Sequence, residues 1–417
     1  MNKTFAATLA ALAISNVAAD DLNKEVGITT VREGIGEVLM LEHTIAQIRA
    51  GYISVESSAD SVRDRSAVAA GGHIHLQTKR FYGLYAAAEL YTVQDMGLQR
   101  SDPDSVEGTF FDAKSSGFST LSQSYVDAAW GKTEIRAGRQ MIDTPHADSD
   151  DIRMMPNYFT AYTVTNRDIE DVTLTAGKIE QMAGWENGVD ASKFVNVGRS
   201  FGSAEDTDGI FFLSALYAGL EDSVLQAWYY DISDIARVLY IEAAHEFYTG
   251  PAHTVVGLQL DRAKGEGREL LGETDSLTWG LSIQVNFKKS GLGLIGAYNR
   301  ENGEGAFGSL GGGPFFTSLE DQTLDAVGAK GRAWIAGISY DFSNIGIEGL
   351  YAETVYGSFR ADDAALYETG ETDLSVSYNL SDRLSVTAAY AFIDDKTASN
   401  EDYSQFRLIA NYNFRSP

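Results

Sequence analysis

The chain has 417 residues, no cysteine and a formal net charge of −27, from 59 acidic and 32 basic residues. The lack of cysteine excludes disulfides and thiolate metal sites. The negative charge argues against binding to nucleic acid, because the chain and the phosphates repel each other. The 41 glycines and the 11% of aromatic residues indicate many strands and tight turns, not a disordered acidic chain.

The N-terminal residues have the layout of a secretory signal. Lys3 supplies a basic start, an apolar run extends from Phe5 to Ile14, and small residues precede Asp20. We predict that residues 1–19 are a signal peptide, cleaved before Asp20. The alternative is an ordinary N-terminal helix. The apolar run is too short to span a bilayer, and no run of roughly eighteen apolar residues follows it.

The following elements are short runs in which apolar and polar residues alternate, as they do in β-strands. We predict eighteen strands, near residues 42–56, 64–79, 81–95, 119–131, 132–141, 158–167, 171–183, 210–219, 222–231, 235–248, 252–264, 275–287, 290–300, 330–343, 344–356, 370–380, 381–394 and 403–414. In DSLTWGLSIQVNF (275–287), one face is apolar and carries Leu277, Trp279, Leu281, Ile283, Val285 and Phe287. The other face is small and polar.

These faces suit a membrane barrel better than a soluble β-sandwich, which can show the same alternation. The apolar faces continue over about ten residues, the length that a tilted strand needs to cross a membrane. Their aromatic residues concentrate near strand ends, as in an interfacial girdle. The small and polar opposite faces suit a water-filled lumen.

The connections support the same interpretation, because short turns alternate with long loops. The long connections near the C-terminus are 301–329, 357–371 and 394–402. Outer-membrane barrels have short periplasmic turns and long outer loops. We therefore predict an all-β fold: a transmembrane antiparallel β-barrel at 41–417 with the third loop folded into the lumen. Residues 20–40 precede it as a periplasmic segment or a plug.

The segment GRQMIDTPHADSDDIRMMPNYF (138–159) interrupts the strands with two prolines and a dense set of charges. Together with QSYVDAAWGKTEIRA before it, this segment resembles the OprD family of Gram-negative outer-membrane porins. IRAGYI (48–53) and AAGGHIHLQTKRFYGLYAAAELYT also resemble the first hairpins of that family. The resemblance implies an eighteen-stranded pore, monomeric or loosely associated, with a constriction shaped by the third loop. It also implies small water-soluble substrates, often amino acids or carboxylates.

The third outer loop, 142–157, is therefore predicted to narrow the pore. An ion in a narrow pore gives up water of hydration and needs replacement charge. Pro145 and Pro156 stiffen the loop, because proline fixes φ and restricts its neighbour. The predicted constriction residues are Asp143, Asp148, Asp150, Asp151 and Arg153. The alternative is that the aspartates only form turns in an exposed loop.

A basic strip is predicted on the facing wall. Side chains of a strand point alternately to its two faces, and the polar face is predicted to line the lumen. This alternation places three arginines on the lumen face: Arg49, Arg136 and Arg407. Arg139 lies at the start of the loop. Counting from the strand ends places Arg49 beside Arg407 when the first strand pairs with the last. Arg139 belongs to the motif shared with the family, whose basic ladder this strip resembles. The alternative is that the arginines pair locally with Glu134, Glu89 or Asp127.

No catalytic motif stands out, and we expect neither an enzyme nor a bound cofactor or metal. His73 and His75 have a spacing that can hold a metal, but no third ligand is evident beside them. The glycine-rich SLGGGPFF (309–316) lacks the flanking strand and helix of a phosphate loop. The predicted function is passive, moderately selective diffusion of amino acids, carboxylates and ions. The alternatives are a lipase-like or protease-like barrel enzyme and a plugged structural or adhesive barrel.

The predicted location is the outer membrane of a Gram-negative bacterium, where the multi-pass barrel contacts outer-membrane lipid and lipopolysaccharide. The sequence leaves open the solute, the sign of the ion preference, and the choice between a monomer and a loose oligomer such as a trimer. The family's barrels typically end on an aromatic residue, whereas Phe414 is followed here by Arg415, Ser416 and Pro417.

Overall fold

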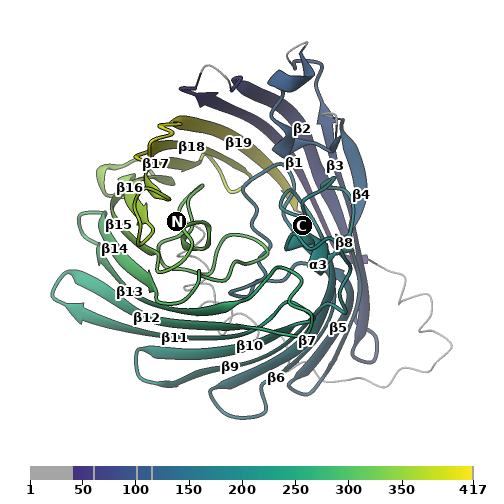
Figure 1. Cartoon of the computed structure of the whole chain (residues 1–417). Coiled ribbons are helices and arrows are strands. Elements are labelled where there is room, and N and C mark those ends of the chain that lie inside the picture. The colour runs from purple at the N-terminus through teal and green to yellow at the C-terminus, as the bar shows by residue number, and fades with distance from the viewer. Residues whose placement is uncertain (1–40, 60–61, 100–101, 114–115, 416–417) are drawn as a thin grey trace.

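The structure is a computed structural model that describes residues 41–59, 62–99, 102–113 and 116–415. Figure 1 shows the strands as a closed ring whose interior is crossed by connecting segments. The predicted signal peptide at 1–19 and the segment 20–40 lie outside the described residues.

Among the described residues, nineteen strands form a single sheet. Their bounds are β1 Leu41–Ser57, β2 Arg65–Thr78, β3 Leu84–Asp95, β4 Phe118–Trp130, β5 Thr133–Gln140, β6 Tyr158–Asn166, β7 Val172–Ala183, β8 Val195–Asn196, β9 Ile210–Leu220, β10 Ser223–Ile232, β11 Ala236–Thr249, β12 Ala252–Gly265, β13 Asp275–Phe287, β14 Leu292–Glu301, β15 Arg332–Asp341, β16 Leu350–Arg360, β17 Glu368–Asn379, β18 Leu384–Asp395 and β19 Tyr403–Arg415. The two-residue β8 only extends the sheet at the end of β7, so eighteen strands form the barrel wall. The eighteen strands predicted from the sequence are confirmed.

Every barrel strand pairs antiparallel with its neighbours, and β1 pairs with β19 to close the sheet. Among the described residues, closure gives each of the eighteen barrel strands a partner on both sides, which a membrane-spanning sheet requires. The closing register pairs Arg49 with Asn411 and Ile53 with Arg407. It therefore sets which side chains of the first and last strands meet in the lumen.

Side chains alternate between the two faces of the wall as the sequence predicts. In β13 the outward Trp279 and Ile283 are 42% and 46% exposed, whereas the inward Ser276 and Thr278 are fully buried. The apolar residues are outside because the surrounding solvent is lipid, and the polar residues line the interior. This reversal of the usual burial pattern identifies the barrel as a membrane protein.

Within the described residues, the helical segments are short and lie in connections. They are α3 (Val197–Ser200), η1 (Pro103–Ser105), η2 (Gly108–Phe110), η4 (Leu324–Ala326) and η5 (Phe342–Ile345). No helix in the described part of the chain is long and apolar enough to cross a membrane.

The hydrophobic core lies inside the barrel, where long connections pack against the wall. One cluster joins Ile142 and Ala147 of the β5–β6 connection to Phe212, Tyr230 and neighbouring wall residues. A second joins the β3–β4 and β5–β6 connections to β1–β3, and a third joins the β14–β15 connection to β15 and β16. Apolar contact thus holds two long connections, 141–157 and 302–331, in the lumen, where they fill part of its cross-section (Figure 1).

Candidate pore constriction

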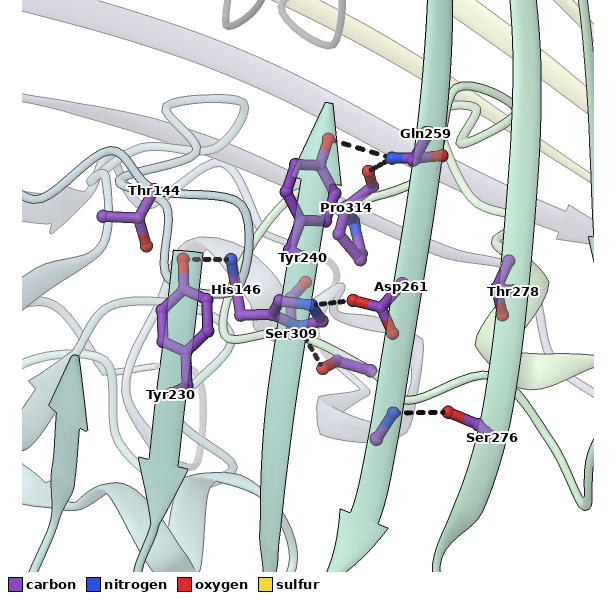
Figure 2. A network of polar contacts seen from close by, with 12 residues as sticks. Thr144, His146, Tyr230, Tyr240, Gln259, Asp261, Ser276, Thr278, Ser309 and Pro314 are labelled. Carbon is purple, nitrogen blue, oxygen red and sulfur yellow. Dashed lines mark hydrogen bonds and ion pairs between the residues drawn. The ribbon is translucent and has the colours of Figure 1, made fainter. Parts of the chain in front are cut away.

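The β5–β6 connection is fixed to the far wall by a buried histidine. His146 Nε2 lies 2.8 Å from Asp261 Oδ2 of β12, and its Nδ1 lies 3.0 Å from the carbonyl oxygen of Gly308. Figure 2 shows the imidazole between Tyr230 and Asp261. His146 and Asp261 are 1% and 0% exposed. Separating the two partners would leave a buried polar group without a hydrogen bond, which is energetically costly. The pair therefore holds the loop against β12.

The same loop is joined to the β14–β15 connection by backbone hydrogen bonds. The Asp148 N–H donates to the Leu310 carbonyl at 2.8 Å, and the Leu310 N–H donates to the His146 carbonyl at 3.0 Å. Gln259 of β12 holds the second segment by donating to the Pro314 carbonyl at 2.5 Å (Figure 2). The two connections therefore form one body across the lumen.

The other end of the loop is held by the first strands of the barrel. Tyr91 of β3 donates to the Met154 carbonyl at 2.7 Å, and Tyr158 donates to the buried Glu89 at 2.7 Å. Gly51 on the lumen face of β1 makes room for this packing. A Cβ at Gly51 would lie 2.6 Å from Met154 Sδ.

The loop meets the wall at a charged cluster. Arg49 of β1 forms a two-pronged ion pair with Asp151, with 2.8 Å between Nη2 and Oδ2. Arg49 also donates to Asn411 at 2.8 Å and to the Arg153 carbonyl at 2.8 Å. Arg49 is 3% exposed, so the guanidinium is almost wholly enclosed by these acceptors.

Arg153 extends this cluster toward the last strand. Its Nη2 donates to Gln405 of β19 at 3.1 Å, and its Nη1 lies 3.5 Å from Glu320 of the β14–β15 connection. The guanidinium stacks on Trp185, 4.5 Å from the ring centroid. Glu320 in turn forms a two-pronged ion pair with Arg407, with 3.1 Å between Nη2 and Oε2. We call Arg49, Asp151, Arg153, Glu320 and Arg407 the constriction cluster.

Two wall carboxylates position Glu320. Asp373 of β17 accepts from the Glu320 N–H at 3.0 Å. Glu371 accepts from the Asp321 and Gln322 N–H groups at 3.0 and 2.7 Å. These three hydrogen bonds tie the tip of the second connection to the wall.

The comparison with protein families decides the identity. The model of the OprD family of outer membrane porins matches residues 105–416. The chain belongs to the OprD family. It is therefore an outer-membrane porin with a β-barrel that spans the membrane many times. The family is one of porins, so a barrel enzyme and a plugged structural barrel are not favoured.

Solved structures of other porins share the fold of this OprD-family chain. Pseudomonas aeruginosa OccK9 (OpdG) has a TM-score of 0.78 at 20% identity, over 90% of this chain and 98% of its own. A BenF-like porin from Pseudomonas fluorescens Pf-5 has a TM-score of 0.78 at 17% identity, over 90% of this chain and 100% of its own. Pseudomonas aeruginosa OpdK, solved with vanillate, has a TM-score of 0.75 at 18% identity, over 90% of this chain and 98% of its own. No curated protein sequence matches the chain significantly.

The predicted loop residues of this porin have different surroundings. Asp151 and Arg153 belong to the constriction cluster. Asp143 is exposed and accepts from the Ser149 N–H, and Asp148 accepts from the Asp150 N–H at 2.7 Å. The Asp148 contact, to the N–H two residues on, is that of a turn-forming aspartate, whereas the Asp143 contact spans six residues of the loop. Asp150 is buried, 7% exposed, beside them.

The four predicted strip arginines do not form one continuous strip. Arg49 and Arg407 face the lumen, but the closing register places them four residues apart, about 13 Å along the strand. The expectation that they lie side by side was wrong. Arg136 pairs with Asp127 at 3.1 Å and with Glu134 at 3.1 Å, the local pairing that was the alternative. Arg139 stacks on Phe194, 4.1 Å from the ring centroid.

His73 and His75 both approach the same carboxylate. Their nearest ring nitrogens lie 4.0 and 3.5 Å from Glu89. Glu89 also accepts from Ser122 at 2.8 Å and from Gln123 at 3.0 Å. In the described residues, no group of three or more histidine, aspartate or glutamate side chains is arranged to hold a metal.

Glu186, in the β7–β9 connection, is a carboxyl group whose pKa is raised beside the β5–β6 connection of this porin. Burial and the nearby Asp150 raise its pKa to about 8, against the Asn157 amide that donates to it at 2.5 Å. A carboxyl group with this pKa loses its proton and gains a negative charge as the pH rises through about 8. We expect cation permeability to rise between pH 7 and 9, measured as the reversal potential in a salt gradient. The Glu186→Gln variant should show no such step, and a step that persists in it would contradict the assignment.

Loss of the His146 anchor should loosen the constriction. In His146→Ala, Asp261 loses its partner while remaining fully buried, and breaking a buried pair costs about 3–5 kcal/mol. We expect noisier single-channel currents and faster proteolysis of the loop. His245→Ala is the matched control, because His245 is exposed on β11. If the single-channel current of His146→Ala is no noisier than that of the parent, the apolar contacts hold the loop without His146.

Proposed function

We propose that this OprD-family porin conducts small hydrophilic solutes passively and prefers those that bear a carboxylate. The observation that carries the proposal is the constriction cluster, which holds three arginines and two acidic residues from two lumenal connections and both closing strands. An entering anion can share the guanidinium donors with Asp151 and Glu320 and so replace part of its lost hydration.

The excess of guanidinium over carboxylate in the cluster favours anions. Arg49 and Arg407 each have one carboxylate partner, while Arg153 shares Glu320 with Arg407. The Arg153 Nε is buried and has no hydrogen-bond partner. The negative net charge of the whole chain is counted over outer loops and does not decide this preference. OpdK, one of the similar structures, was solved with vanillate, which bears a carboxylate.

Liposome swelling tests the proposal. Vesicles containing the porin are exposed to solutes of matched size: an aromatic monocarboxylate, a neutral amino acid, a neutral sugar and a diamine. We expect the carboxylate to enter fastest and the diamine slowest. The Arg153→Gln variant should reduce the difference between them. Equal rates for all four solutes in the parent porin would contradict a carboxylate preference.

We further propose that the porin is not an enzyme and that a single chain forms the complete pore. The pairing of β1 with β19 supports the second point, because each chain closes its own barrel. Light scattering of the detergent-solubilised porin, with the detergent mass subtracted, should give one chain per micelle together with open single-channel steps.

A further inference from the structure

Three arginines lie in register on the outer surface of the barrel. Arg300 of β14 is the pairing partner of Arg332 of β15, and Arg332 is the partner of Arg360 of β16. These strands are adjacent in the barrel wall (Figure 1). Neighbouring strands are about 4.8 Å apart, so the three Cα atoms span about 10 Å. We call these three residues the arginine row.

The arginine row faces outward at the outer rim of the membrane. Arg332 has the parity of Trp334, which is 43% exposed, and not that of the fully buried Ala333. Arg300 lies on the same face of β14 as Tyr298, and Arg360 lies on the same face of β16 as Tyr356. Both faces point outward. All three arginines are within two residues of a strand end that joins an outer connection. The row therefore lies at the level where lipid headgroups meet the barrel.

Aromatic rings lie directly below the arginine row. Trp279 and Tyr298 are 5.4 Å apart between ring centroids, and Trp334 and Tyr356 are 5.5 Å apart. Tyr298 and Trp334 are partners across β14 and β15, each two residues below an arginine. Such rings mark the membrane interface. The guanidinium groups are thus one pleat, about 7 Å, further from the hydrocarbon.

The arginine row has fewer protein counter-charges than arginines. Across the described residues, Arg300 and Arg332 have no side-chain hydrogen bond or ion pair, whereas Arg360 forms an ion pair with Glu368 at 3.7 Å. Like charges directly opposite each other on neighbouring strands destabilise a sheet. Nearby outward arginines differ: Arg262, for example, pairs with Asp275 at 2.5 Å. Arg300 and Arg332 therefore keep two positive charges that no carboxylate among the described residues neutralises.

We propose that the arginine row binds the phosphates of lipopolysaccharide in the outer leaflet. The bisphosphorylated glucosamine headgroup of lipid A presents anionic oxygens at this depth, and arginine binds phosphate with two parallel hydrogen bonds. Its acyl chains would cover the aromatic and aliphatic residues below. The proposal rests on the outer-membrane location and does not depend on the solute that the pore conducts.

Native mass spectrometry of the detergent-solubilised porin tests this binding. Bisphosphorylated lipid A, monophosphorylated lipid A and phosphatidylglycerol are added separately to the porin. We expect bisphosphorylated lipid A to bind at least about tenfold more tightly than phosphatidylglycerol, and monophosphorylated lipid A to lie between them. Equal binding of bisphosphorylated lipid A and phosphatidylglycerol would overturn the proposal.

Variants locate the site. We expect Arg332→Gln to weaken the binding of bisphosphorylated lipid A and Arg300→Gln/Arg332→Gln/Arg360→Gln to abolish the preference. The control is a triple variant that loses the same three positive charges from exposed periplasmic turns, Lys79→Gln/Lys132→Gln/Lys289→Gln. It should bind lipid A like the parent. Parental conductance of each variant reports an intact barrel and tests the pore separately. If the arginine variants bind lipid A like the parent, the proposal is wrong.

Discussion

Replacing Arg49 and Arg407 with alanine should shift the ion preference of the pore strongly toward cations. Each arginine now neutralises a carboxylate, Asp151 or Glu320, at the lumen surface. The double variant removes two positive charges and leaves both carboxylates without these partners. A single uncompensated charge within about 4 Å of a wet passage is worth about 1 kcal/mol or more. The permeability ratio should therefore change by at least about fivefold.

The reversal potential in a potassium chloride gradient measures this change, and we expect it to shift strongly toward cation preference. Arg136→Ala is the matched control, because Arg136 also faces the lumen but pairs with Asp127 and Glu134 in the wall. The control should shift the reversal potential much less. An unchanged reversal potential in the double variant would mean that the permeating ions do not pass close to Arg49 and Arg407, contrary to the prediction.

The opposite change is expected for Glu320→Gln. Glu320 is the carboxylate that Arg153 and Arg407 share, at 3.5 Å and in a two-pronged pair. Glutamine keeps the size and the backbone hydrogen bond to Asp373 but removes the negative charge. Two buried guanidinium groups are then left without their main counter-charge. Anion permeability should rise by at least about fivefold, because an entering anion replaces the missing carboxylate.

Reversal potentials and swelling rates with a monocarboxylate measure the effect of Glu320→Gln. Glu304→Gln is the matched control, since Glu304 lies in the same connection but is exposed near the outer rim. The control should leave the permeability ratio unchanged. A similar shift in both variants would assign the effect to the electrostatic field of the loops as a whole, contrary to a local role of Glu320.

The strands of the barrel wall were predictable because the alternation of apolar and polar residues is visible within each strand. In a strand, each side chain faces opposite to the next, so a run such as 275–287 reveals both faces without knowledge of its neighbours. The same parity correctly placed Arg49 and Arg407 in the lumen. The short turns and long connections then indicated which ends face the periplasm.

The closing register was not predictable from a count along each strand. The count assumed that the first and last strands end at the same level. A closed barrel needs staggered strands, and the structure pairs Ile45 with Arg415. The stagger places Asn411, instead of Arg407, opposite Arg49. The side-by-side prediction failed for this reason.

The partners of the loop were also hidden, because they are far apart in the sequence. Glu320 is 87 residues from Arg407, and His146 is 115 residues from Asp261. Sequence analysis treated the 301–329 connection as an outer loop and missed Glu320. Its apolar residues were the available signal: Phe315 and Leu324 are almost completely buried in the lumen, whereas a solvated loop would not need them.

Thiol modification tests most directly whether the pore narrows at the constriction cluster. The chain has no cysteine, so Asp151→Cys introduces a single thiol there, and Ala398→Cys introduces one in an exposed outer connection. Single-channel current is recorded while a bulky, charged thiol reagent is added. We predict a stepwise loss of roughly half the current or more in Asp151→Cys and no change in Ala398→Cys. Full current through modified Asp151→Cys channels would contradict a constriction at this cluster.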